Sequence, residues 1–305
     1  MLDGLSGRAR VLASADDQYP RGLRELSDAP GHLRIVGDLP DLSLSVSIVG
    51  TRLADDEALD FTYGFARKLA FEGVVVVSGG AVGIDRAAHE GAVDGGGRTI
   101  VVLPIGFDKP YPAANHDLFE RVISAGCLLT EVPDGTDMQK GRFLTRNRLV
   151  AALGHSTVVT QAPARSGALS TARHAKALGR PVFTTPASPW DPRGSGNLIL
   201  LQKGARICMG PGDVLSGSAV GAGVVDASGP KDGRDNPNYS NLSPSEHQIL
   251  DALRGRARHA EDLCHRTGIP AFEVQRSILS LLVRGLVEEK PGGRFQSCRR
   301  SAKPY

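Results

Sequence analysis

Three consecutive residues, Gly50, Thr51 and Arg52, combine a tight turn, a hydroxyl and a guanidinium. They directly follow the apolar run Val46–Val49, and residues 55–73 after them carry apolar side chains at helical spacing. Unpaired N–H groups at the start of a helix favour negative charge, and an arginine can bind a phosphate through two hydrogen bonds. The sequence therefore predicts a phosphate-binding turn between a strand and a helix whose first turn faces the ligand. The alternative is an ordinary tight turn with a surface ion pair of Arg52, because short glycine motifs often match by chance.

A glycine-rich segment, residues 78–85, follows the next apolar run and offers a second place for a ligand. Small residues such as Gly79 let the backbone approach a ligand closely, and Ser78 is expected to donate to a phosphate or a base. Asp85 is more typical of a helix cap than of catalysis. His89 is expected to pack or to form a hydrogen bond rather than to act as a general acid.

The most basic segment of the first two hundred residues contains an aromatic residue. Lys140 and Arg146 are expected to contact phosphates while the ring of Phe143 stacks on an unpaired base, a combination typical of single-stranded nucleic-acid binding. Two alternatives compete with this interpretation: Phe143 packs in the core, and the arginines form ion pairs. The pairs to consider join Arg146 or Arg148 to Asp85 or Glu131.

Ser166 and Gly167 follow a further β-branched run and open another predicted helix. N–H groups at such a position make a third cradle for an anion. Ser166 also suits the role of an ordinary helix cap. The two roles are compatible.

Short β-branched runs alternate with helical patterns between residues 45 and 215. The runs are residues 74–77, 99–103, 128–130, 157–160, 181–184 and 206–208. This alternation predicts an α/β fold, a Rossmann-like parallel sheet with helices on both faces. Ligands of such sheets bind beyond the carboxyl ends of the strands, where the motifs above fall. We therefore expect the motifs to converge on one crevice.

The rest of the chain predicts a second, small domain. Residues 216–241 are rich in Gly, Ser, Asp, Asn and Pro, a composition typical of a flexible linker. Residues 242–296 predict three helices and a hairpin, the winged-helix pattern, with Ser243 and Glu246 as a capping box. Residues 297–305 form a basic tail. Contact with DNA and contact with protein are both open for this domain, because winged helices serve either purpose.

Composition narrows the class of protein. A chain of 305 residues is long enough for about two domains, and a net charge of +3 with a pI of about 8.7 suits a polyanionic partner without binding DNA by bulk charge. The four widely spaced cysteines predict neither a disulfide framework nor a zinc site. Residues 1–17 lack the apolar core of a signal peptide, and no apolar run approaches the length of a membrane span. We expect a cytoplasmic protein without a membrane partner.

The order and spacing of the motifs resemble the DNA-processing protein A (DprA/Smf) family. The motifs are Gly-Thr-Arg, Ser-Gly-Gly-Ala-x-Gly-Ile-Asp-x-x-Ala-His, Phe-x-x-Arg-Asn-Arg and Ser-Gly-x-Leu-x-Thr-Ala, in this order along the chain. The resemblance implies an extended Rossmann-like DNA-binding domain over residues 19–215. Residues 1–18 are then a stub in place of the helical domain that many members carry, and residues 242–296 are the family's winged-helix domain.

Membership of this family implies a homodimer that binds and protects incoming or exposed single-stranded DNA and loads the RecA recombinase onto it during natural transformation. The positions that the resemblance and the motifs single out for single-stranded DNA are Gly50, Thr51, Arg52, Ser78, Gly79, Lys140, Phe143, Arg146, Ser166 and Gly167. The motifs contain no metal-ligand cluster, no nucleophile paired with a base and no pair of acids. We therefore expect a binding protein and not an enzyme, with no cofactor and no metal.

The chain departs from the family pattern at four positions. Val82 stands in place of an arginine, Leu144 of a proline, Gln161 of a glutamate and Ala187 of a glycine. Loss of the arginine removes a potential phosphate contact, so we expect a lower affinity for DNA than in a typical member. Two other classes of protein stay open. One is a nucleotide-binding or nucleotide-cleaving Rossmann-like protein similar to the lysine-decarboxylase-like phosphoribohydrolases, and the other is a winged-helix regulator that binds duplex DNA.

Overall fold

The computed structural model describes residues 4–217, 242–253, 258–284, 286–290 and 293–297. The chain divides into two compact units, Met1–Val225 and Asp226–Tyr305, which are described separately. The predicted linker from residue 218 onward and the basic tail from residue 298 onward lie outside the described residues. Within the described part of the chain, no helix has the length and apolar character that crossing a membrane requires.

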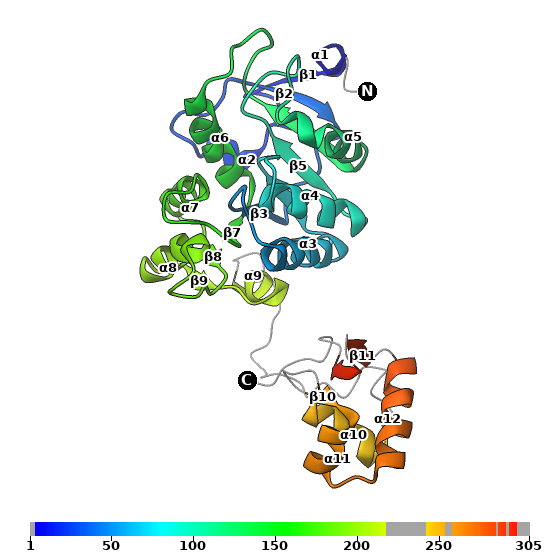
Figure 1. Cartoon of the computed structure of the whole chain (residues 1–305). Helices are drawn as coiled ribbons and strands as arrows, with labels where there is room; N and C mark the ends of the chain where they lie inside the picture. Colours follow the sequence, from blue (N-terminus) through cyan, green and yellow to red (C-terminus); the bar gives the residue numbers. More distant parts are fainter. Residues whose placement is uncertain (1–3, 218–241, 254–257, 285, 291–292, 298–305) are drawn as a thin grey trace. The chain divides into compact units, whose positions relative to one another are not determined.

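The large unit is built on a nine-stranded sheet with the order β1-β2-β6-β5-β4-β3-β7-β8-β9 among the described residues (Figure 1). The strands are β1 Arg10–Ala13, β2 His32–Gly37, β3 Ser45–Val49, β4 Val75–Ser78, β5 Thr99–Val102, β6 Gly126–Thr130, β7 Ser156–Val159, β8 Val182–Thr184 and β9 Arg206–Ile207. All neighbours from β6 to β9 in this order are parallel. The predicted α/β class with a Rossmann-like parallel sheet is confirmed.

The sheet starts earlier in the chain than predicted. β1 pairs antiparallel with β2, and β2 pairs antiparallel with β6, so residues 10–13 belong to the sheet and not to a separate stub. Leu12 lies opposite Leu33 in this register and packs in the core. A four-residue edge strand with one buried side chain gives little periodic signal.

Helices cover both faces of the sheet, which explains why the central strands are buried along their whole length and mainly apolar. The longer helices are α3 Asp56–Phe71, α4 Ile84–Asp94, α5 His116–Ala125, α6 Lys140–Leu153, α7 Ala168–Ala177, α8 Ser195–Gln202 and α9 Pro211–Gly217, with short α1 Leu5–Arg8 and α2 Arg21–Arg24. Leu149, Ala172 and Leu200 place α6, α7 and α8 in one core. Phe65 and Ala88 place α3 and α4 in another core, with β3 and β4 contributing to both.

The small unit contains α10 Pro244–Ala252, α11 Ala260–Thr267 and α12 Ala271–Val283, followed by the strands β11 Val287–Lys290 and β12 Arg294–Ser297. The predicted capping box is present. The Glu246 N–H donates to Ser243 Oγ at 3.2 Å, and the Ser243 N–H donates to the Glu246 carboxylate at 2.6 Å. A short strand that the sequence did not predict, β10 Arg258–His259, completes an antiparallel sheet with the order β10-β12-β11. Three helices with a hairpin confirm the winged-helix pattern.

Candidate functional site

The predicted motifs converge at the carboxyl ends of three adjacent strands, β4, β3 and β7. The Thr51 N–H donates to the Gln161 carbonyl at 2.7 Å, and the Ile84 N–H donates to the Thr51 carbonyl at 3.2 Å. A Cβ on Gly50 would lie 2.5 Å from Ile84 Cγ1 and 2.8 Å from the Gln161 carbonyl oxygen. Gly50 is therefore needed for the close approach of the three loops to one another. The loops therefore meet at one edge of the sheet as expected, and the crevice there stays a prediction.

An exposed cation and two aromatic rings form the centre of this edge. The guanidinium carbon of Arg52 lies 4.9 Å from the ring centre of Phe143, whose ring meets that of Tyr111 edge-on at 5.8 Å and 79°. Arg52 is exposed, Phe143 is half-buried and Tyr111 is 43% exposed, so ligand can reach all three. We call these three residues the Arg52 stack. Phe143 is thus not a core residue, and Tyr111, which the sequence motifs did not single out, joins the site.

The start of α6 lies beside the Arg52 stack, because Phe143 belongs to its first turn. No acidic residue lies in this turn and no side chain caps it. Lys140 is the first residue of the helix and is exposed. Uncapped N–H groups, the positive end of the helix dipole and an exposed ammonium group together favour an anion here.

The start of α3 differs from the prediction. Asp55 caps this helix by accepting the Ala58 N–H at 2.8 Å, and Asp56 and Glu57 occupy the first turn. These carboxylates already satisfy the helix dipole and repel a phosphate. The expectation that the first turn of α3 faces an anionic ligand is therefore wrong.

Arg146 lies inside the protein rather than on the binding surface. Only 6% of the residue is exposed, and its Nη1 donates to the carbonyl oxygens of Gly79 and Val102. Burial lowers the pKa of the guanidinium to about 10, while the nearby Asp85 raises it, so the group stays charged at neutral pH. The predicted direct contact of Arg146 with a phosphate is therefore wrong. The buried side chain instead positions the loop of Gly79, and its positive charge lies beneath that loop.

The glycine-rich loop after β4 serves the same arrangement. A Cβ on Gly79 would collide with the guanidinium of Arg146. Ser78 is fully buried, and its hydroxyl donates to the Ile48 carbonyl at 2.6 Å. The predicted donation from Ser78 to a ligand is therefore wrong, because the strand end turns this side chain into the core.

The loop before α7 is linked to α6 through Asn147, which sequence reasoning missed. Asn147 Oδ1 accepts from Arg146 Nε at 3.3 Å, and its Nδ2 donates to the Gly167 carbonyl at 3.1 Å. Ser166 Oγ accepts the Ala168 N–H at 3.2 Å at the start of α7, while Gly167 occupies the N-cap position. The position of Asn147 between Arg146 and Arg148, within the basic motif, was the sequence signal that could have indicated this role.

Gln161, one of the departures from the family pattern, has a defined partner. Its Nε2 donates to Asp55 Oδ2 at 2.6 Å, and its Oε1 accepts the Asp55 N–H at 3.2 Å. Arg193 Nη1 lies 3.2 Å from the same Asp55 oxygen. A glutamate at position 161 would place a second carboxylate beside Asp55, whereas the amide satisfies both polar groups.

Two buried titratable residues lie behind the loops. Burial raises the pKa of Asp85, and Arg146 opposes this rise. Burial lowers the pKa of His89 to about 3, and His89 Nδ1 lies 2.8 Å from Thr99 Oγ1. His89 is therefore neutral and hydrogen-bonded in the interior, as expected from its sequence context. Arg148 pairs with Asp28 at 2.7 Å and with Glu131 at 2.8 Å, so the ion-pair alternative holds for this arginine.

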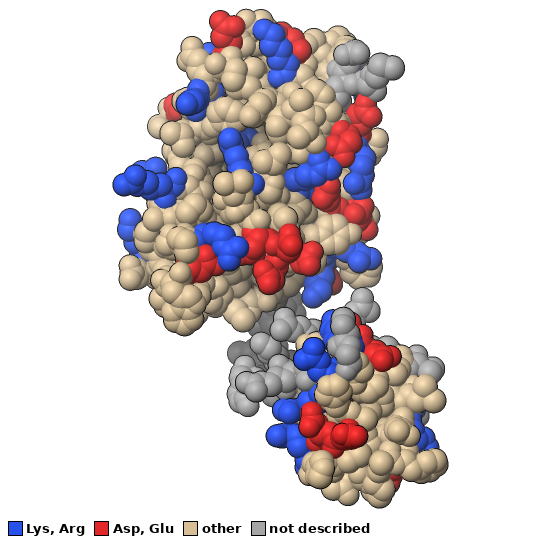
Figure 2. All heavy atoms as spheres, in the orientation of Figure 1, with Lys and Arg blue, Asp and Glu red and all other residues tan. Residues whose placement is uncertain are grey.

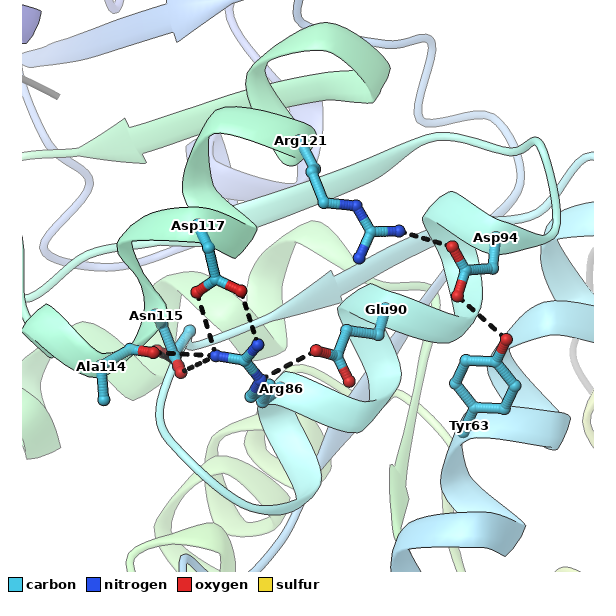
Figure 3. A network of polar contacts seen from close by, with 9 residues as sticks. Tyr63, Arg86, Glu90, Asp94, Ala114, Asn115, Asp117 and Arg121 are labelled. Atoms are coloured by element: carbon cyan, nitrogen blue, oxygen red, sulfur yellow. Dashed lines mark hydrogen bonds and ion pairs between the residues drawn. The ribbon is translucent and has the colours of Figure 1, made fainter. Parts of the chain in front are cut away.

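A polar network secures the other side of the site (Figure 3). Arg86 binds Glu90 on its own helix and Asp117 on α5, at 2.8 and 2.7 Å. It also donates to Asn115 Oδ1 at 2.9 Å, and Asn115 Nδ2 donates to the Gly80 carbonyl at 2.9 Å. The glycine loop is therefore held from α5 as well as from α6.

The charges on this protein are intermingled rather than gathered on one basic face of the view in Figure 2. Among the described residues, no group of three His, Cys, Asp or Glu side chains is placed to hold a metal ion.

A Rossmann-like parallel sheet with glycine-rich loops at its carboxyl edge, together with a winged-helix unit, defines a class of two-domain α/β proteins. Residues 10–219 match the family described as DNA recombination-mediator protein A, and residues 234–293 match the DprA winged helix domain. The chain belongs to this DprA/Smf family, whose members process DNA in recombination.

Relatives with similar sequences align with most of the chain. The putative DNA processing protein DprA of Mycobacterium tuberculosis is 38% identical over 299 residues, covering 93% of this chain and 76% of the relative. Protein Smf of Synechocystis is 32% identical over 319 residues, covering 94% and 80%.

Two solved structures share the fold of the large unit. DNA processing protein A of Streptococcus pneumoniae has a TM-score of 0.65 at 35% identity, covering 70% of this chain and 76% of that chain. DNA processing protein A of Helicobacter pylori has a TM-score of 0.62 at 34% identity, covering 69% and 95%. The study of the H. pylori protein concerns its mode of binding single-stranded DNA.

Proposed function

We propose that this protein binds single-stranded DNA along the carboxyl edge of its large sheet. The observation that carries the proposal is the Arg52 stack, in which an exposed guanidinium lies over an accessible ring beside the uncapped start of a helix. Unpaired bases stack on aromatic rings, and phosphates bind guanidinium and helix N–H groups. The relative from H. pylori, which binds single-stranded DNA, supports the same assignment.

Each part of the site has a distinct role in this proposal. Arg52 and Lys140 bind phosphates, and Gly50 and Thr51 give the turn its shape. Phe143 receives a base, with Tyr111 supporting the ring from its edge. Gly79, Arg146, Ser166 and Gly167 hold the three loops at fixed distances, and Ser78 supports them from the core. Binding alone accounts for these groups, so the function needs no catalytic step.

The wider role follows from the family. We infer that the protein forms a homodimer in the cytoplasm, protects incoming or exposed single strands and passes them to the RecA recombinase in natural transformation and recombination. The description of the family as a recombination mediator supports a transfer to a recombinase. The inference about RecA is tested by strand exchange with DNA coated by a single-strand binding protein, with and without this chain.

The winged-helix unit favours a protein contact over a duplex groove. Its third helix, α12, exposes Phe272 and Leu279 on either side of Arg276 in sequence, with exposed fractions of 77% and 64% for the two apolar residues. Helices that read a DNA groove carry polar side chains toward the base edges. This observation weighs against the duplex-binding regulator.

Binding of a labelled oligo-dT and of the matching duplex across a salt series tests the proposal. We expect a preference for the single strand, a strong loss of affinity in Arg52→Ala, and a salt slope that falls by about one in Lys140→Ala. Arg67→Ala is the matched control, because it removes an exposed arginine in the second half of α3, away from the strand ends. Equal affinities of Arg52→Ala and Arg67→Ala would contradict the assignment. Binding of mononucleotides without binding of the oligonucleotide would support the nucleotide-binding alternative.

A further inference from the structure

The single tryptophan of this chain is among the most exposed side chains of the large unit. Trp190 is 86% exposed and lies in the loop between β8 and α8. Proline precedes and follows it at positions 189 and 192, and the Asp191 N–H donates to the Ser188 carbonyl at 3.1 Å. The Asp191 carboxylate accepts the Arg193 N–H at 2.9 Å. This turn therefore holds the indole outward with little backbone freedom to lose on binding.

The Trp190 turn is fastened to the loops of the candidate site. Arg193 Nη1 lies 3.2 Å from Asp55 Oδ2, and Asp55 caps the helix that follows the Arg52 turn. Ser195 Oγ accepts the Ala164 N–H at 2.9 Å, which fixes the turn to the loop after β7. Since β7 and β8 are parallel neighbours, the turn emerges at the same edge of the sheet as Arg52.

The charges around Trp190 suit a base rather than a phosphate. Arg193 donates from Nε and Nη2 to Asp191, both at 3.0 Å, and its Nη1 contacts Asp55. The nearby cation is thus already engaged by carboxylates, while the indole face stays open. Aromatic planes bind bases of any sequence, because every base has a π-face.

We propose that Trp190 stacks on an unpaired base of the same single strand that the Arg52 stack holds. This inference rests on the proposed function, and it extends the binding surface from β3 across β7 to the loop after β8. A contact made through stacking contributes affinity without neutralising a phosphate. Loss of the ring therefore weakens binding at every salt concentration by the same factor.

The experiment follows oligo-dT binding by two signals, the anisotropy of a labelled strand and the emission of Trp190 itself. Because no other tryptophan is present, a change of emission reports on this position alone. We expect the strand to quench the emission of the wild type, and Trp190→Ala to bind about tenfold more weakly with an unchanged salt slope. Trp190→Phe should keep most of the affinity. Phe71→Ala is the matched control, because Phe71 is an aromatic residue 82% exposed at the far end of α3.

The outcomes separate this inference from the proposed function. Binding with unchanged emission, together with equal affinity of Trp190→Ala and the wild type, would overturn the stacking role. No binding of the labelled strand by the wild type would remove both proposals together. A loss in Trp190→Ala that Trp190→Phe does not restore, or that comes with an altered far-ultraviolet circular dichroism spectrum, would indicate a structural role and would also overturn the inference.

Discussion

The guanidinium carbon of Arg52 lies over the ring of Phe143, 4.9 Å from the ring centre, although 91 positions separate the two residues in the sequence (143 − 52). Contacts of this kind at exposed sites contribute about 0.5–1 kcal/mol. The pair is therefore weak enough for an incoming base to share the ring. It nevertheless orients both groups before the strand arrives.

Phe143→Leu separates stacking from apolar packing. Leucine keeps an apolar side chain on α6 but offers no aromatic plane, so we expect the affinity for oligo-dT to fall about tenfold, in line with the energy of a stacked base. The salt slope should stay as in the wild type, because Arg52 and Lys140 are still present. Fluorescence anisotropy at several salt concentrations measures both quantities. A reduced slope with unchanged affinity at low salt would contradict the stacking role.

Gly79→Ala tests the fit between the glycine loop and Arg146. The added Cβ collides with the buried guanidinium, so we expect the free energy of unfolding to fall by about 1–3 kcal/mol. Gly141→Ala is the control, because a Cβ at that helical position meets open space and alanine favours helix. Urea denaturation of both variants measures the difference. Equal stability of the two variants would show that Arg146 can move without cost.

Gln161→Glu tests the partner of Asp55. We expect this variant to be less stable than the wild type at neutral pH, because two carboxylates would lie within hydrogen-bond distance of each other. Adding Asp55→Asn should recover most of the loss, since one charge is removed. Thermal unfolding of the single and double variants at neutral pH shows the coupling. No recovery in the double variant would mean that the loss has another origin.

His89 makes the stability of the large unit depend on pH. Its folded-state pKa of about 3 lies below the ordinary value of 6.5, so the unfolded chain binds the proton more tightly. The contribution of His89 to the free energy of unfolding is therefore fully present above about pH 6.5. It is lost as the pH falls, by about 2 kcal/mol on reaching about pH 5. Denaturant unfolding of the wild type and of His89→Gln measures this loss, which the variant should lack. His32→Gln, which changes an exposed histidine of β2, should keep the pH dependence of the wild type.

Sequence patterns predicted the elements better than the directions of individual side chains. The central strands were found because parallel strands buried on both faces are continuous apolar runs. Arg146 was misassigned because it lies in a segment rich in basic residues, although the apolar Leu149 and Val150 at spacings of three and four indicate that its side of α6 is buried. Ser78 was misassigned because the last residue of a strand can face either way. The directions of the Arg146 and Ser78 side chains do not follow from the residue composition of their segments.

The link from Gly79 through Arg146 and Asn147 to Gly167 has a kinetic consequence. Two loops and one helix are joined by hydrogen bonds before any ligand is present. On the proposed function, a DNA strand therefore meets a preformed surface, and no folding step precedes contact. Encounter should then proceed at a rate set by diffusion and by local charge, and substitutions at the surface should alter mainly the lifetime of the complex.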